Sequence, residues 1–183
     1  MNKINMKKIK ISKAWAYHKF MCSKDYIINV CHGSCCQGSN KILISLLPNE
    51  VAKHEQNGKC VIDNKLQADG QTGICPYKNN NGLCALHGTS DKPFGCIASP
   101  FTINSNDTLI IRHRYSRMKC HGDGLYSYIV FRPSLNLIFG ENEAQRICDE
   151  LTMHMNDDVE IYGYMPIENY NNLKYLDGIK KQM

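Results

Sequence analysis

The chain has 183 residues, a net charge of +5 and ten cysteines. This length suits one domain, since domains usually contain about 100–200 residues. The cysteine content stays below the roughly 8–10% of small secreted disulfide scaffolds, and no apolar run reaches the about 18 residues of a membrane-spanning helix. We therefore expect a cytoplasmic protein without a membrane segment, whose clustered thiols stay reduced and bind metal or take part in redox chemistry.

The first third of the chain predicts little regular structure. Residues 1–21 form a basic lead-in that lacks the apolar segment of a signal peptide, and we expect it to pack on the domain through Trp15 and Phe20. The apolar run 41–47 favours a short strand.

A helix and a long irregular region follow. Pro48 is typical of the first turn of a helix, and Gly58 is typical of its end. Residues 70–100 are rich in Gly, Asn and Cys without a sustained period, which indicates loops. Something other than an apolar core must hold these loops together.

The remaining elements are predicted more clearly. Residues 108–111 favour a strand, and the apolar segment 125–139 favours a helix that starts or bends near Pro133. The strongest helix signal covers residues 141–155, where the apolar residues share one face. These residues are Ala144, Ile147, Cys148, Leu151 and Met155.

A last strand and helix complete the expected fold. Residues 157–164 suit a strand, and Pro166 is expected to open a short helix. Together these elements predict an α+β fold, a small loop-rich single domain organised around a cysteine-ligated metal centre. Within it, residues 22–122 would be the cysteine-cluster region, and residues 123–183 would pack on the same domain.

Six cysteines are the first candidate ligands of the metal or cofactor. Thiolates bind zinc and iron–sulfur clusters strongly, and distant thiolates that converge can hold a small domain together. These candidates are Cys31, Cys35, Cys36, Cys75, Cys84 and Cys96.

Cys35 and Cys36 are adjacent, which restricts how they can bind. Neighbouring side chains diverge in a helix or a strand, so both reach one centre only from a tight turn, which Gly33 and Gly38 permit. Alternatively, the two thiolates serve two neighbouring ions.

The order of the cysteines resembles a known family. Over about residues 22–122 the pattern is similar to the YkgJ-type cysteine-cluster family, described as a zinc- or iron-chelating domain. A more distant similarity to flagellin lysine-N-methylase involves Phe20 and Cys22. The matching motifs are Cys31-x3-Cys35-Cys36, Gly73-x-Cys75-Pro76-Tyr77, Gly82-Leu83-Cys84-x-Leu86-His87, Lys92-Pro93-x2-Cys96 with Pro100-Phe101, and Cys120-His121-Gly122.

The resemblance implies a metal centre and adds Cys120 to the six candidate ligands, which makes seven. The spacing of the cysteines leaves the identity of the metal open. Seven or eight cysteines suffice for two four-thiolate zinc sites, or for one [4Fe-4S] cluster with some left over. We favour the iron–sulfur cluster, because the short C-x2-C knuckle of zinc ribbons is absent and the family is also described as iron–sulfur. Zinc is the alternative.

The other cysteines and the histidines are judged individually. Cys148 and Cys60 are expected in the core, and Cys22 is left undecided. A surface or capping role is favoured for His87. His121, beside Cys120 in a Gly-rich turn, is the candidate for acid–base catalysis.

Two classes of function follow from these patterns. In the first, the metal centre is active, as a redox enzyme or an enzyme that modifies a macromolecule. In the second, zinc staples a module that binds nucleic acid or protein through the basic stretch 112–119. The sequence lacks a phosphate-binding glycine loop, a GxSxG elbow and an HExxH helix, so it gives no support to nucleotide hydrolysis, esterase or zincin chemistry.

Overall fold

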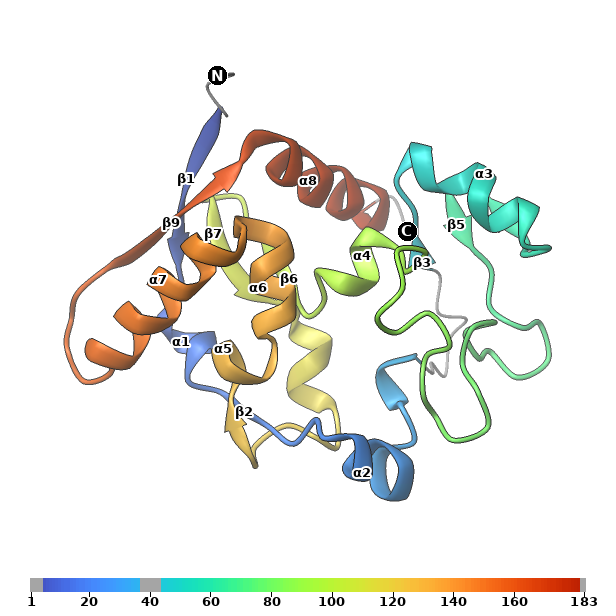
Figure 1. Cartoon of the computed structure of the whole chain (residues 1–183), viewed down its shortest axis with the longest axis horizontal. Helices are drawn as coiled ribbons and strands as arrows, with labels where there is room; N and C mark the ends of the chain where they lie inside the picture. Colours follow the sequence, from blue (N-terminus) through green and yellow to red (C-terminus); the bar gives the residue numbers. More distant parts are fainter. Residues whose placement is uncertain (1–4, 37–43, 182–183) are drawn as a thin grey trace.

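The computed structural model describes residues 5–36 and 44–181 (Figure 1). Its largest sheet has four strands in the order β6-β7-β1-β9. The central pair β7 and β1 runs parallel, and both outer pairs are antiparallel. The strands are β1 (Met6–Ile11), β6 (Phe101–Ile103), β7 (Thr108–Ile111) and β9 (Ile161–Pro166).

Strand β1 corrects the expected lead-in. The segment expected to lie outside the regular structure pairs with β9 over its whole length and also with β7. Its side chains alternate, because Ile9 and Ile11 are buried while Lys8 is exposed. This period of two indicates a half-buried strand, but the many lysines hide it. The expected burial of Trp15 and Phe20 is confirmed.

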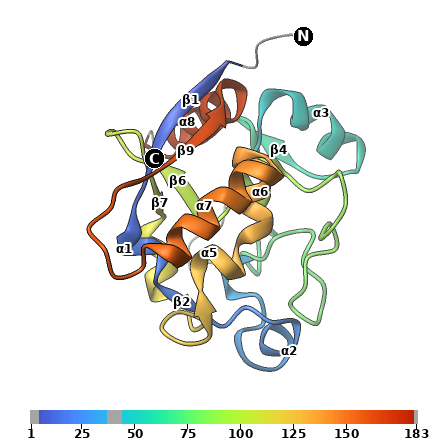
Figure 2. The ribbon, with the colours of Figure 1, turned by 60° about the vertical axis from the view of Figure 1, so that its left-hand side comes forward.

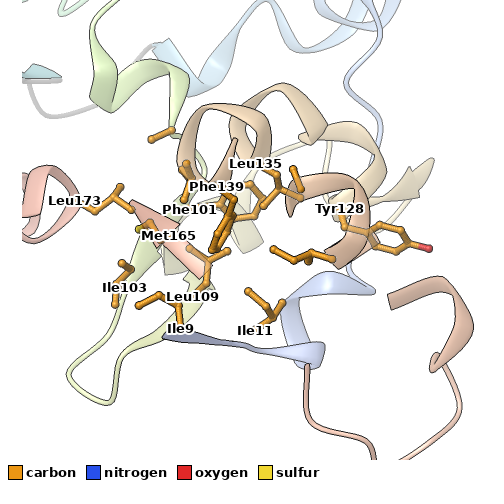
Figure 3. Close-up of a cluster of buried hydrophobic side chains, with 14 of the residues drawn as sticks. Ile9, Ile11, Phe101, Ile103, Leu109, Tyr128, Leu135, Phe139, Met165 and Leu173 are labelled. Carbon is orange, nitrogen blue, oxygen red and sulfur yellow. The ribbon is translucent and has the colours of Figure 1, made fainter. Parts of the chain in front are cut away.

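Helices cover one face of this sheet (Figures 1 and 2). Their apolar side chains meet those of the strands in the main core (Figure 3), where Ile9, Leu109, Phe139 and Met165 are almost fully buried. The helices are α5 (Ser127–Val130), α6 (Arg132–Phe139), α7 (Glu141–Met153) and α8 (Ile167–Lys181).

Most predicted elements occur with shifted ends. The strand at residues 108–111 is confirmed, and the apolar segment 125–139 breaks at Phe131 so that Pro133 lies in the first turn of α6. The last strand begins four residues later than predicted, at Ile161, because the chain first turns after α7. Helix α8 is longer than the short helix expected there.

The rest of the chain consists of short elements and loops, most of which occupy the right-hand and lower parts of Figure 1. Helix α3 starts at Pro48 as predicted, whereas residues 41–43 of the predicted strand lie outside the described residues. The short elements are α1 (Lys13–Ala16), β2 (Lys19–Phe20), α2 (Lys24–Tyr26), η1 (Ile27–Cys31), η2 (Ser34–Cys36), β3 (Ile44–Ser45), α3 (Pro48–Gln56), β4 (Val61–Ile62), β5 (Lys65–Leu66), α4 (Phe94–Ile97), η3 (His113–Arg117) and β8 (Leu125–Tyr126).

These elements make a small single domain of mixed helix and sheet, in agreement with the predicted α+β class. Of the helices in the described part of the chain, none has both the length and the apolar composition that crossing a bilayer requires.

Asp107 ties the turn between β6 and β7 to two other elements. Its carboxylate accepts a hydrogen bond from the Tyr170 hydroxyl (2.7 Å) in α8 and pairs with Lys7 (2.8 Å) in β1. Lys174 of α8 lies 3.4 Å away. Hydrogen bonds from Lys7 and then Tyr170 hold the pKa of Asp107 at about 2, below its ordinary 3.8. The carboxylate therefore fastens one end of the sheet to α8.

We expect Asp107→Asn to lower the free energy of unfolding at neutral pH by about 1 kcal/mol or less, because water weakens charge pairs this exposed. Asparagine tolerates the backbone φ of 50° at this position, so the change tests the charge. Since the folded pKa is depressed, the stabilisation is present above pH 3.8 and is lost as the pH falls toward about 2. Urea unfolding curves of the two proteins should converge across that window, and a pH-independent difference would contradict this role.

Candidate functional site

The predicted cysteines all lie outside the main sheet, on short turns and loops. Cys31 and Cys75 are buried, and the other five are partly buried. The segment from α2 to η2 lies near the loops of residues 70–92 in both views of the ribbon (Figures 1 and 2). Three stretches that are far apart in the sequence thus carry the cysteines into one region.

The turn at residues 31–36 brings three of the cysteines together. A π-helical turn, η1, ends at Cys31, and His32 and Gly33 then adopt left-handed backbone angles, with φ of 49° and 62°. The 3-10 turn η2 follows and holds Cys35 and Cys36 with their Sγ atoms 4.0 Å apart. The tight turn that the adjacent cysteines require is therefore present, although Gly38 lies outside the described residues.

Cys120 is held beside Cys22 by backbone pairing. Strand β2 pairs with β8, and the Met21 amide donates a hydrogen bond to the Cys120 carbonyl at 2.8 Å. A Cβ atom at Gly124 would lie 2.4 Å from the Phe20 carbonyl oxygen, so only glycine allows this approach. Cys22 was undecided from the sequence, and the structure places it next to a predicted ligand.

The 31–36 turn also contacts the segment that leads to Cys120. The Ser34 hydroxyl lies 3.8 Å from the Met118 sulfur, and the Tyr26 hydroxyl donates to the Lys119 carbonyl at 2.9 Å. These contacts join the beginning of the cysteine region to its end.

Cys75 and Cys84 approach the same turn from its other side. The Cys75 amide donates to the Cys36 carbonyl at 3.4 Å, and Lys78 pairs with Cys84 in an isolated antiparallel bridge. The Asn79 side chain accepts hydrogen bonds from two backbone amides and closes the turn between them. This geometry confirms the Asn-rich turn that the sequence indicates.

Cys96 is positioned by helix α4 and by one carboxylate of α3. Glu50 accepts hydrogen bonds from the amides of Leu47 (2.7 Å) and Phe94 (2.6 Å), so it joins the start of α3 to the start of α4. The Cys96 amide donates to the Pro93 carbonyl at 2.9 Å. Glu50 thereby orients the short helix that carries Cys96.

The thiol groups influence each other electrostatically. The pKa of Cys120 is raised to about 11, mainly by burial and in smaller part by Cys22, Cys31 and Cys35. Burial likewise raises the pKa of Cys96 to about 12, with further contributions from Cys75 and Cys84. Cys120 and Cys96 therefore interact with different thiols.

The pKa values of Cys35 and Cys36 are shifted in opposite directions. The interaction with Cys36 lowers the pKa of Cys35, and the positive charges of Arg114 and Lys78 act in the same direction. The pKa of Cys36 is raised by the interaction with Cys35 and by burial. Cys35 is therefore the thiol of this pair that ionises first.

The described side chains do not form a complete metal site. Within residues 5–36 and 44–181, no three His, Cys, Asp or Glu side chains are arranged closely enough to hold an ion. The backbones nonetheless place eight thiols on adjoining turns.

The remaining predicted residues have mixed outcomes. Cys148 is buried in α7 as predicted, and His87 is exposed. The expectation for Cys60 is wrong, because it is exposed just before the short strand β4. His121 is partly buried, and its Nε2 atom lies 3.3 Å from Nδ1 of His18, a partner that the sequence did not indicate.

No family model, no curated protein and no solved structure matches this chain. The resemblance to the YkgJ-type family is therefore carried by the cysteine motifs alone and stays a prediction.

Two glycines allow the central contact between the cysteine loops. A Cβ atom at Gly82, where φ is 80°, would lie 2.6 Å from the His32 carbonyl carbon, and a Cβ atom at Gly33 would lie 2.1 Å from the Gly82 oxygen. Both neighbours are backbone atoms that cannot rotate away. Any side chain here must separate the turn at 31–36 from the loop that carries Cys84.

We expect Gly82→Ala to destabilise the protein more than Gly88→Ala. Gly88 has a similar φ of 78° but nothing near its Cβ position, so it reports the backbone strain alone, about 1–2 kcal/mol. The clash at Gly82 should add about 1–3 kcal/mol. Denaturant unfolding measures both, and equal losses would show that the contact does not constrain the loops.

Proposed function

We propose that this chain binds metal through its clustered cysteines, as an iron–sulfur protein with a [4Fe-4S] cluster, and that zinc is the alternative. The observation that carries the proposal is the arrival of thiols from three distant stretches of the chain on adjoining turns. Thiolates are the preferred protein ligands of both metals.

The packing of the loops supports a structural need for metal. Among the described residues, the main apolar cluster includes none between Leu47 and Phe94. A segment of this length cannot obtain its stability from the core that holds the sheet and helices. Metal binding can supply it, because the free energy of binding becomes free energy of folding when the site forms only in the folded chain.

The basic stretch favours this proposal over a nucleic-acid module. Arg112 is partly buried with its side chain 2.9 Å from the Ser99 hydroxyl, and the charge of Arg114 acts on Cys35 and Cys36. The stretch is interrupted by the 3-10 turn η3 and does not form an extended strand with one basic face. Arg114, Arg117 and Lys119 are its exposed cations.

An active centre would use the imidazole beside Cys120. Under this proposal His121, paired with His18, is the candidate that carries a proton in redox chemistry or in modification of a macromolecular substrate. Cys120 and His121 lie on the same tight turn, so the imidazole is held next to a proposed ligand.

Purification without oxygen tests the proposal. We expect a brown protein with charge-transfer absorbance in the visible range and with iron and sulfide in equal amounts. A colourless protein that contains zinc would support the zinc alternative and rule out the iron–sulfur cluster. A folded protein with no bound metal would contradict the proposal.

Replacing Cys35 and Cys36 together by serine should remove bound metal and destabilise the fold, because both thiols lie where the cysteine loops meet. Cys60→Ser is the matched control, since this cysteine is exposed and lies outside the cluster. Elemental analysis and thermal unfolding of the three proteins provide the measurements. Full metal content in the double variant would show that the site lies elsewhere.

A further inference from the structure

We propose that eight of the thiols form two separate four-thiolate metal sites, with Cys35 in one and Cys36 in the other. This inference rests on the proposed function and deepens it. It also assigns Cys22 as a ligand. The first site consists of Cys22, Cys31, Cys35 and Cys120, and the second site consists of Cys36, Cys75, Cys84 and Cys96.

The turn η2 explains why adjacent cysteines belong to different sites. A 3-10 turn has three residues per turn, so consecutive side chains point about 120° apart around its axis. Cys35 and Cys36 are the last two residues of this turn. One of them can face the segment ending at Cys120 while the other faces the loop of Cys75.

Backbone contacts assemble the first site. The hydrogen bond from the Met21 amide to the Cys120 carbonyl places Cys22, which follows strand β2, beside Cys120. The contact of Ser34 with Met118 brings the turn that contains Cys31 and Cys35 against the same segment. In agreement with this, the thiols that act on Cys120 are the other three members of the first site.

A different set of contacts assembles the second site. The Cys75 amide bonds to the Cys36 carbonyl, and the bridge at Lys78 returns the chain so that Cys84 lies beside Cys75. Helix α4 brings Cys96. The thiols that act on Cys96 are Cys75 and Cys84. Cys36 interacts most strongly with its sequence neighbour Cys35, and then with Cys96 and Cys75. Cys22 and Cys120 are not among the largest influences on either.

Three cations, Arg114, Lys78 and Lys92, interact with thiols of both proposed sites. Four thiolates around a divalent ion or cluster leave a net charge of about −2, so two such sites repel each other. Each cation acts on one thiol from each site, which reduces this repulsion. The pairs are Cys35 and Cys36 for Arg114, Cys35 and Cys75 for Lys78, and Cys22 and Cys96 for Lys92.

Partial removal of metal from the whole wild-type chain tests this division without relying on variants that must fold. The protein, purified without oxygen, is treated with increasing amounts of a chelator, exposed thiols are alkylated, and the modified cysteines are identified by peptide mass mapping. The untreated protein should contain two zinc ions, or two [4Fe-4S] clusters with about eight iron atoms. Cysteines should then become reactive in two groups of four, with the membership given above. Exposed Cys60 and buried Cys148 are internal references for full and minimal reactivity.

The outcomes separate this inference from the proposed function. One ion or one cluster per chain would overturn the two-site division and leave the proposed function standing. The division would also be overturned if the chain binds two ions or clusters but its cysteines become reactive all together, or in groups with other members. A folded chain without metal would overturn both.

Single variants provide a second readout. Cys22→Ser should retain about half of the wild-type metal and keep the second-site cysteines protected from alkylation, and Cys84→Ser should show the reverse pattern. Full metal content in folded Cys22→Ser would remove Cys22 from the first site and overturn the inference.

Discussion

The cysteine region depends on one constraint, the approach of two backbones at Gly33 and Gly82. The turn at 31–36 lies against the loop that carries Cys84, with no space for a side chain between them. On its other side, the same turn contacts Met118 near Cys120. Because one short turn contacts both neighbours, its position decides which thiols can meet.

The scaffold and the cysteine loops are stabilised in different ways. The sheet and its helices share an apolar core, and the cysteine loops are joined to it by the β2–β8 pairing, by Glu50 and by Phe94 of α4, which enters the core. Burial raises the pKa of several thiols in these loops, so ionising them all at neutral pH requires positive charge. Arg114, Lys78 and Lys92 supply part of it, and the proposed metal would supply the rest.

Local patterns predicted much of the secondary structure. Helix α7 was predictable because its apolar residues follow the period of a helix over its whole length. Strand β7 was predictable because it is a short apolar run with two adjacent isoleucines, which favour strands. Strand β1 was missed because four of its first five positions are Met or Lys, and only its pairing with β9 shows its role. Cys60 was misjudged because a short apolar neighbourhood does not reveal which side of a two-residue strand faces the core.

The sequence by itself determined which thiols are candidate metal ligands. Seven cysteines occur in a recognisable order, in a glycine-rich region that offers them no apolar core. Only the tertiary structure decided their neighbours. Cys22 lies beside Cys120 because the Met21 amide bonds to the Cys120 carbonyl, about a hundred positions along the chain. Cys36 lies beside Cys75 because the Cys75 amide bonds to the Cys36 carbonyl, about forty positions away. Such pairings depend on how strands and loops from distant parts of the chain come together, and no local pattern of residues contains that information.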